Sequence, residues 1–162
     1  MIELITDSTS DLSPELLERY HIKRVPLSVF VDGKDLKDGD LPLAQLFDAV
    51  DRTGELPKTS AVPVAEFQQL FSSPNDVIYI GLSSQLSATH QNAILAAAEI
   101  EGKRIAVIDS LNLSTGIGLL VPDLEIIHIH AHDAAAPVVA AVFELPPGVV
   151  NRRGEKHSVH LV

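Results

Sequence analysis

Short aliphatic runs alternate with segments of helical spacing along the first 120 residues of the chain. The continuous apolar runs, which are typical of strands buried on both faces, span residues 2–6, 77–82 and 104–108. Helices are expected where apolar residues recur at helical spacing or alanine dominates, over residues 14–21, 65–71 and 89–100, with a further helix opening near 114. Because strands and helices alternate, the sequence predicts an α/β fold with a mostly parallel sheet flanked by helices.

Two of the expected helices carry recognisable terminal residues. Ser13 followed by Pro14 predicts an N-cap with proline at the first helical position. Asp40 is expected to cap the next helix, and Gly54 is expected to end it. The apolar residues of that helix recur at helical spacing: Leu43, Leu46, Phe47 and Val50. We therefore expect the helix to pack by one face.

The segments on either side of that helix carry different patterns. Residues 25–31 are expected to form one strand that ends at the turn sequence Asp32-Gly33. Residues 56–63 contain two prolines and several polar side chains, so they are expected to form an ordered loop without a regular element.

The composition of the chain changes near residue 121. Residues 121–162 contain five of the seven histidines and four of the ten prolines, and no helical period continues through them. The sequence therefore predicts one domain over residues 1–120, followed by an atypical C-terminal extension that resembles a truncated or frame-shifted ending.

Charge and composition exclude several classes of protein. The formal net charge of −10 disfavours broad binding to nucleic acid or anionic membranes. No run approaches the roughly 20 apolar residues of a membrane span, and the first residues do not resemble a signal peptide. The absence of cysteine excludes thiol chemistry and fits a reducing compartment. We expect a cytoplasmic protein.

The segment with the most candidate chemistry follows the apolar run at 77–82. It places the hydroxyls of Ser83, Ser84 and Ser87 at the carboxyl end of a buried strand, where open α/β sheets bind ligands. It contains no Lys or Arg, which favours a carboxylate ligand over a polyphosphate. Helix capping accounts for the same hydroxyls, so both interpretations remain open.

Two further loops carry polar clusters. Thr59 and Ser60 form a second pair of hydroxyls, which either converge on the first segment or form local turns. Asp7 and Ser8 follow the first strand in a segment that superficially resembles the aspartate-nucleophile loop of phosphohydrolases, but Thr9 occupies the place of the second aspartate. Asp7 and Ser8 are therefore expected to tie adjacent loop backbones together.

The C-terminal extension offers one alternative chemistry. The segment contains three alternating histidines, His128, His130 and His132, followed by Asp133. On a strand the three imidazoles would lie on one face, where they could bind zinc. This pattern supports the hypothesis of a metal-dependent hydrolase. Surface histidines in a tail of unusual composition are the competing interpretation.

Several segments, taken in order, resemble the DegV family of bacterial fatty-acid-binding proteins. The matching segments are Ile5-Thr6-Asp7-Ser8-Thr9-Ser10-Asp11-Leu12, Val25-Pro26-Leu27, Lys58-Thr59-Ser60, Leu82-Ser83-Ser84-Gln85-Leu86-Ser87-Ala88-Thr89 and Val107-Ile108-Asp109-Ser110. They cover residues 1 to about 120. The sequence departs from the family pattern at Ala61, which follows Lys58-Thr59-Ser60, and at Ala88 and His90, which follow Ser87.

The resemblance implies a DegV-like N-terminal domain that holds a long-chain fatty acid in an apolar tunnel. It assigns the carboxylate ligands to Thr59 and Ser87, with Ser60, Ser83 and Ser84 nearby. It further implies that a separate fatty acid kinase phosphorylates the bound acid, so that the chain itself needs no catalytic residue, metal or cofactor. Family members are nearly twice as long, which leaves a nonfunctional fragment as a further alternative.

Overall fold

The computed structural model describes residues 2–121, 149–150, 156–157 and 159–161. Its main sheet has five strands in the order β10-β7-β6-β1-β2. The bounds are β1 (Ile2–Asp7), β2 (Lys23–Val25), β6 (Asp76–Gly81), β7 (Ile105–Asp109) and β10 (Val159–Leu161). The first four run parallel, and β10 pairs antiparallel with β7. The predicted α/β fold with a mostly parallel sheet is confirmed.

The parallel strands are buried on both faces, as their continuous apolar runs predict. One face of the sheet carries Ile5, Val77, Tyr79 and Val107, and the other carries Leu4, Ile78, Ile80 and Ala106. Successive side chains of a strand point to opposite faces, so an uninterrupted apolar run supplies two cores.

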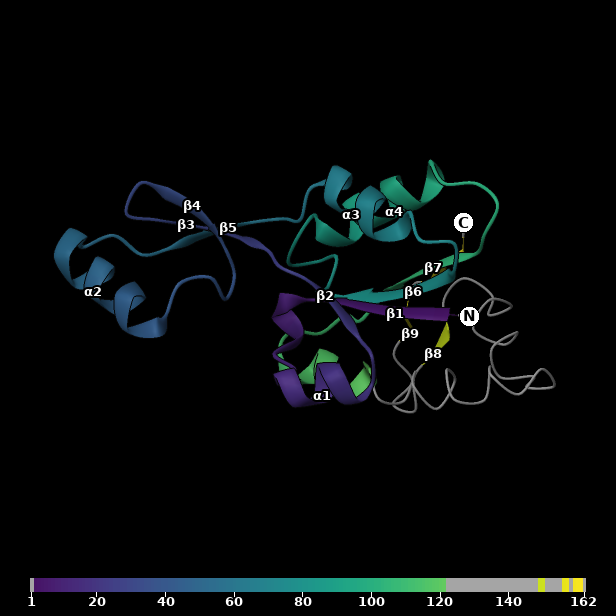
Figure 1. Ribbon diagram of the computed structural model, residues 1–162, viewed down its shortest axis with the longest axis horizontal. Coiled ribbons are helices and arrows are strands. Elements are labelled where there is room, and N and C mark those ends of the chain that lie inside the picture. The colour runs from purple at the N-terminus through teal and green to yellow at the C-terminus, as the bar shows by residue number, and fades with distance from the viewer. Residues whose placement is uncertain (1, 122–148, 151–155, 158, 162) are drawn as a thin grey trace.

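Helices cover both faces of the sheet (Figure 1). On one side lie α3 (Val64–Phe71) and α4 (Thr89–Ala98), which bury Phe67, Phe71 and three alanines against the sheet. On the other side lie η1 (Ser8–Ser10), α1 (Pro14–Arg19) and the helical residues 115–121. The rings of Phe67 and Tyr79 meet edge to face with centroids 5.0 Å apart, a geometry that aromatic pairs favour.

The expected helix ends are partly correct. Ser13 Oγ accepts a hydrogen bond from Leu16 N at 3.4 Å, and Gly54 ends α2 (Leu43–Thr53) with a left-handed φ of 70°. The expectation that Asp40 caps α2 is wrong, because Pro42 occupies the N-cap and makes no side-chain capping bond. Asp40 Oδ2 instead accepts from Lys37 N at 3.3 Å and holds the turn before the helix.

The single strand expected over residues 25–31 is wrong. β2 ends at Val25, and β3 (Ser28–Val31) belongs to a separate sheet of order β4-β3-β5, with β4 (Lys34–Lys37) beside it. Pro26 separates the two strands, and proline has no N–H to extend a strand ladder. The chain therefore leaves the main sheet at this residue.

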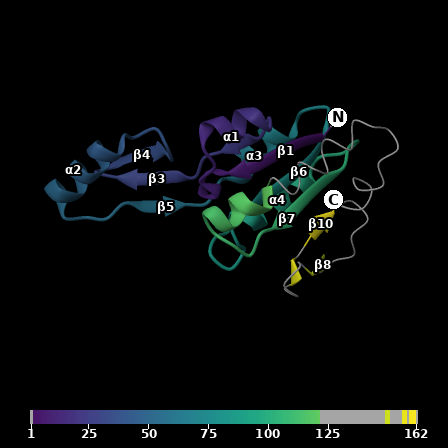
Figure 2. The same ribbon diagram turned by 90° about the horizontal axis from the view of Figure 1, so that it is seen from below.

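The loop expected over residues 56–63 contains a strand. β5 (Lys58–Ser60) pairs antiparallel with β3, with Thr59 opposite Val29. The pairing partner lies about thirty residues away, which a local sequence pattern does not record. With α2, the three strands form a unit at residues 28–60 that projects away from the main sheet (Figures 1 and 2).

Near the C-terminus, β8 (Val149–Val150) and β9 (Lys156–His157) form an antiparallel pair. His128, His130, His132 and Asp133 lie outside the described residues. Within the described part of the chain, no helix is long and apolar enough to cross a bilayer.

Candidate functional site

A buried carboxylate links the loops at the carboxyl ends of β1 and β6. Asp7 Oδ2 accepts hydrogen bonds from the Tyr79 hydroxyl and from Leu82 N, both at 2.8 Å, and Oδ1 accepts from Thr9 N at 3.0 Å. Ser8 Oγ accepts from Leu27 N at 3.1 Å. The expectation that Asp7 and Ser8 tie adjacent backbones together is confirmed. A carboxylate so fully engaged is poorly suited to act as a nucleophile.

Gly81 is required for this arrangement. A Cβ at this position would lie 1.9 Å from the Tyr79 hydroxyl and 2.4 Å from Asp7 Oδ2. Both atoms belong to the buried network, so neither can withdraw without breaking a hydrogen bond. The glycine therefore permits β6 to end against the Asp7–Tyr79 pair.

A second buried carboxylate holds the serine-rich loop that follows β6. Asp109 stands at the end of β7, and its Oδ1 accepts from Ser84 N and Leu111 N, each at 3.1 Å. Ser83 N donates to Asn112 O at 3.1 Å. The loop is thus fixed from the neighbouring strand by backbone contacts, which leaves its side chains to be considered separately.

The three predicted serines of this loop differ in their surroundings. Ser83 is buried, and its hydroxyl accepts from Gln85 N at 3.2 Å. Ser84 is exposed. Ser87 is half-buried, and its Oγ lies 2.9 Å from Thr89 Oγ1 and 3.2 Å from Thr89 N. Ser83 is therefore engaged within the loop, whereas Ser84 and Ser87 have accessible side chains.

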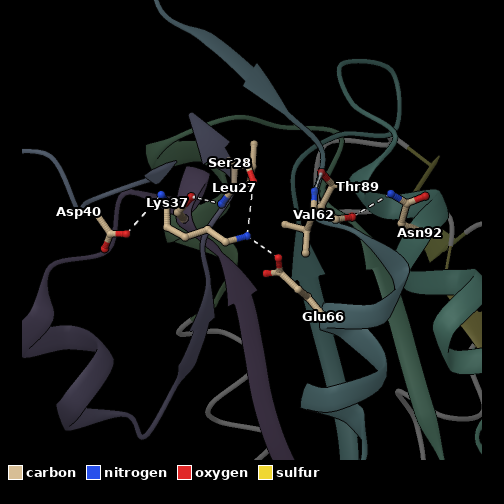
Figure 3. Close-up of polar contacts among 9 residues, drawn as sticks. Leu27, Ser28, Lys37, Asp40, Val62, Glu66, Thr89 and Asn92 are labelled. Atoms are coloured by element: carbon tan, nitrogen blue, oxygen red, sulfur yellow. Dashed lines mark hydrogen bonds and ion pairs between the residues drawn. The ribbon is translucent and has the colours of Figure 1, made fainter. Parts of the chain in front are cut away.

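The chain that follows the second hydroxyl segment reaches the same region from the projecting unit. Thr59 and Ser60 are exposed on β5. Just beyond them, Val62 N donates to Thr89 Oγ1 at 3.3 Å, and Val62 O accepts from Asn92 Nδ2 at 2.8 Å (Figure 3). The chain that follows β5 is therefore anchored to the N-terminus of α4.

Thr89 joins the two segments that the sequence singles out. Within the described residues, the link between the chain carrying Thr59 and the loop carrying Ser87 runs through Val62 and Thr89, without a direct hydrogen bond between the two. Sequence reasoning missed Thr89 and Asn92 as joining residues. The available sequence clue was that Thr89 follows Ser87 by two residues at an expected helix start.

A hollow of about 480 Å³ lies at the base of the projecting unit. One wall comes from the end of β2 and the other from α3: Arg24, Val25, Pro26, Glu66, Gln69 and Leu70. Beside it, Lys37 Nζ forms an ion pair with Glu66 and lies 3.4 Å from Ser28 Oγ (Figure 3). The hollow therefore has both apolar and charged walls.

No metal site emerges at this edge of the sheet. Among the residues described, no group of three or more histidine, cysteine, aspartate or glutamate side chains is arranged to hold a metal ion. The histidine cluster proposed from the sequence falls in the part of the chain that is not described. The described residues thus offer no support for a metal-dependent hydrolase.

Comparisons with known proteins agree on one family. A family model described as an uncharacterised protein of the DegV family matches residues 1–128. A DegV domain-containing protein of Caldanaerobacter subterraneus is 35% identical over 153 residues, covering 91% of this chain and 54% of that protein. A DegV domain-containing 15.5 kDa protein of Staphylococcus aureus is 36% identical over 126 residues, covering 75% of this chain and 89% of that protein.

A solved structure supports the same grouping. A structure described as fatty acid binding of a DegV family protein from Thermus thermophilus superposes with a TM-score of 0.72 at 30% identity. The match covers 87% of this chain and 51% of the Thermus chain. This chain therefore spans about half the length of the Caldanaerobacter and Thermus proteins, and most of the length of the short Staphylococcus protein.

Proposed function

The chain belongs to the DegV family, and from this we propose that it binds a long-chain fatty acid at the carboxyl edge of its main sheet. The hydroxyls of Thr59 and Ser87 hold the carboxylate, and the acyl chain lies in apolar space beside them. The observation that carries the proposal is the junction at Thr89, which connects the segments carrying the two hydroxyls. The Thermus relative, described as binding fatty acid, supports the same ligand class.

The chemistry of the two segments suits a carboxylate. A hydroxyl donates one hydrogen bond, and bonds to an ionised acceptor are shorter and stronger than neutral ones. The loop from Leu82 to Thr89 contains no cation, so it favours a singly charged head group over a polyphosphate. Ser60 and Ser84 are exposed next to the proposed ligands, and Ser83 supports the loop through its own hydrogen bond.

Burial of the acyl chain supplies most of the binding free energy in this proposal. Each buried methylene contributes about 0.8 kcal/mol, so a long chain outweighs two hydrogen bonds from neutral hydroxyls. Val25, Pro26 and Leu70 give the hollow at the base of the projecting unit apolar walls. The hydroxyls then orient the head group and select its chemistry.

We further propose that the bound acid is presented to a separate fatty acid kinase in the cytoplasm and that this chain is not itself an enzyme. The DegV resemblance implies this partner. The sequence has no Walker A loop to hold ATP, and Asp7 is engaged in structural hydrogen bonds. Phosphoryl transfer is therefore assigned to the partner.

The test is lipid retention by a double variant, Thr59→Ala with Ser87→Ala. Bonds to a carboxylate contribute roughly 1.5–3 kcal/mol each, so mass spectrometry of extracted lipid should find at least about tenfold less fatty acid. Ser13→Ala is the control, because its hydroxyl caps α1 on the opposite face of the sheet. Equal fatty acid in the double variant and the control would refute the assignment of the head-group residues.

A further inference from the structure

The hydroxyls of Ser87 and Thr89 are hydrogen-bonded to each other, and their surroundings determine which of the two donates. The two oxygens are 2.9 Å apart, and either can be the donor. Ser87 Oγ also accepts from Thr89 N, and Thr89 Oγ1 also accepts from Val62 N. Each hydroxyl oxygen therefore already accepts one hydrogen bond from a backbone N–H. The remaining question is which of the two hydroxyl hydrogens lies between the two oxygens.

Burial breaks the symmetry of the pair. Thr89 is fully buried, whereas Ser87 is half-buried. If Ser87 donated to Thr89, the Thr89 hydrogen would be left without an acceptor among the described residues of the core, which is unfavourable. The stable direction is therefore from Thr89 to Ser87. Ser87 then accepts two hydrogen bonds, and its own hydrogen remains available on the accessible side.

We infer that Thr89 is a positioning residue that makes Ser87 a committed hydrogen-bond donor and so selects an ionised carboxylate over a head group that must donate. The inference rests on the fatty-acid site proposed above and specifies its selectivity. With both acceptor positions of Ser87 occupied, an ammonium head group, which can only donate, finds no lone pair there, and an alcohol can only accept from Ser87 and must place its own hydrogen elsewhere. A carboxylate offers only acceptors, and it matches the single donor that Ser87 presents.

The variant Thr89→Val tests this role, because valine keeps the shape of threonine and removes the hydroxyl. Ser87 then regains an acceptor position and serves an alcohol as well as an acid. The measurement is the ratio of affinities for a fatty acid and the fatty alcohol of equal chain length, by competition against a fluorescent fatty acid. We expect the ratio to fall about two- to tenfold in Thr89→Val, because the bond that the alcohol gains joins neutral groups. Thr89→Ser should restore it.

Asn92→Ala is the matched control for a structural effect. Asn92 Nδ2 donates to the carbonyl oxygen of the same Val62, and among the described residues it makes no hydrogen bond to Ser87. We therefore expect this variant to weaken acid and alcohol equally and to leave their ratio unchanged. An equal fall of the ratio in Asn92→Ala and Thr89→Val would overturn the inference in favour of general loosening.

Thr89→Ala removes the same hydroxyl without placing a methyl group there, so it repeats the test where Thr89→Val folds poorly. Since Thr89 acts through Ser87, Ser87→Ala should lower the ratio as far as Thr89→Val, and adding Thr89→Val to it should change the ratio no further. An unchanged ratio in Thr89→Val while the wild type binds fatty acid would overturn the inference alone. Failure of the wild type to bind fatty acid would instead overturn the proposed function.

Discussion

The Tyr79 hydroxyl lies 2.8 Å from Asp7 Oδ2 inside the core, and it donates a hydrogen bond across the sheet from β6 to the end of β1. Both side chains are fully buried. This bond and the one from Leu82 N offset much of the desolvation free energy of the buried Asp7 carboxylate. The loop that carries Ser87 begins at Leu82, so its position depends on this pair.

Tyr79→Phe should therefore destabilise the fold. The substitution keeps the ring that packs on Phe67 but leaves one Asp7 oxygen with a single partner. We expect a loss of roughly 1.5–3 kcal/mol in the free energy of unfolding, because the acceptor is charged. Urea titration followed by circular dichroism measures it. Tyr20→Phe, at a half-buried site on the other side of the sheet, should change stability by less than about 0.5 kcal/mol.

Tyr79 should also make stability fall in alkali. Burial raises the pKa of Tyr79 well above its ordinary value, and the neighbouring Asp7 carboxylate adds to the rise. The unfolded state loses the phenolic proton first, so this contribution is complete below the ordinary tyrosine pKa and declines as the pH rises beyond it. The wild type should lose more stability than Tyr79→Phe between about pH 9.5 and 11. Parallel losses in the two proteins would contradict this.

Gly81→Ala should be more damaging than an exposed glycine substitution. The new methyl would overlap the Tyr79 hydroxyl and Asp7 Oδ2, and overpacking in a tight core typically costs about 1–3 kcal/mol or more. Gly102→Asn is the control, because its surroundings are open and asparagine tolerates its positive φ. A thermal unfolding scan that ranks the control below Gly81→Ala would show that the space beside β6 is not restrictive.

Asp76→Asn should lower stability more at neutral pH than in acid. Partial burial opposes ionisation, yet the backbone N–H and guanidinium of Arg104 together hold the pKa of Asp76 below its ordinary value. The pair stabilises the fold above the ordinary aspartate pKa and is lost as the pH falls through the lowered one. Because Arg104 is more than half exposed, we expect less than about 1 kcal/mol at pH 7. Urea midpoints at pH 7 and pH 2.5 measure the difference, which should be smaller at the lower pH.

Local patterns predicted the three central strands of the main sheet well, and they predicted its edge strands and the projecting unit poorly. The runs ending at Asp7, Gly81 and Asp109 are strands because each is apolar enough to be buried on both faces. β5 was expected to be a loop, since its three exposed residues carry no burial pattern and are ordered by pairing with β3. The break at Pro26 was visible as a proline, but local spacing did not show that the chain leaves the sheet there.

Residue types and their order determined that this chain builds an α/β sheet and that two hydroxyl-bearing segments border it. They also determined the family resemblance and the structural use of Asp7 and Ser8. Only the tertiary structure decided that Thr89 lies between the chain after β5 and Ser87, and that Asp7 meets Tyr79 beside Gly81. The physical reason is that composition and spacing act along the chain, whereas burial and hydrogen-bond partners depend on which distant segments come together in space.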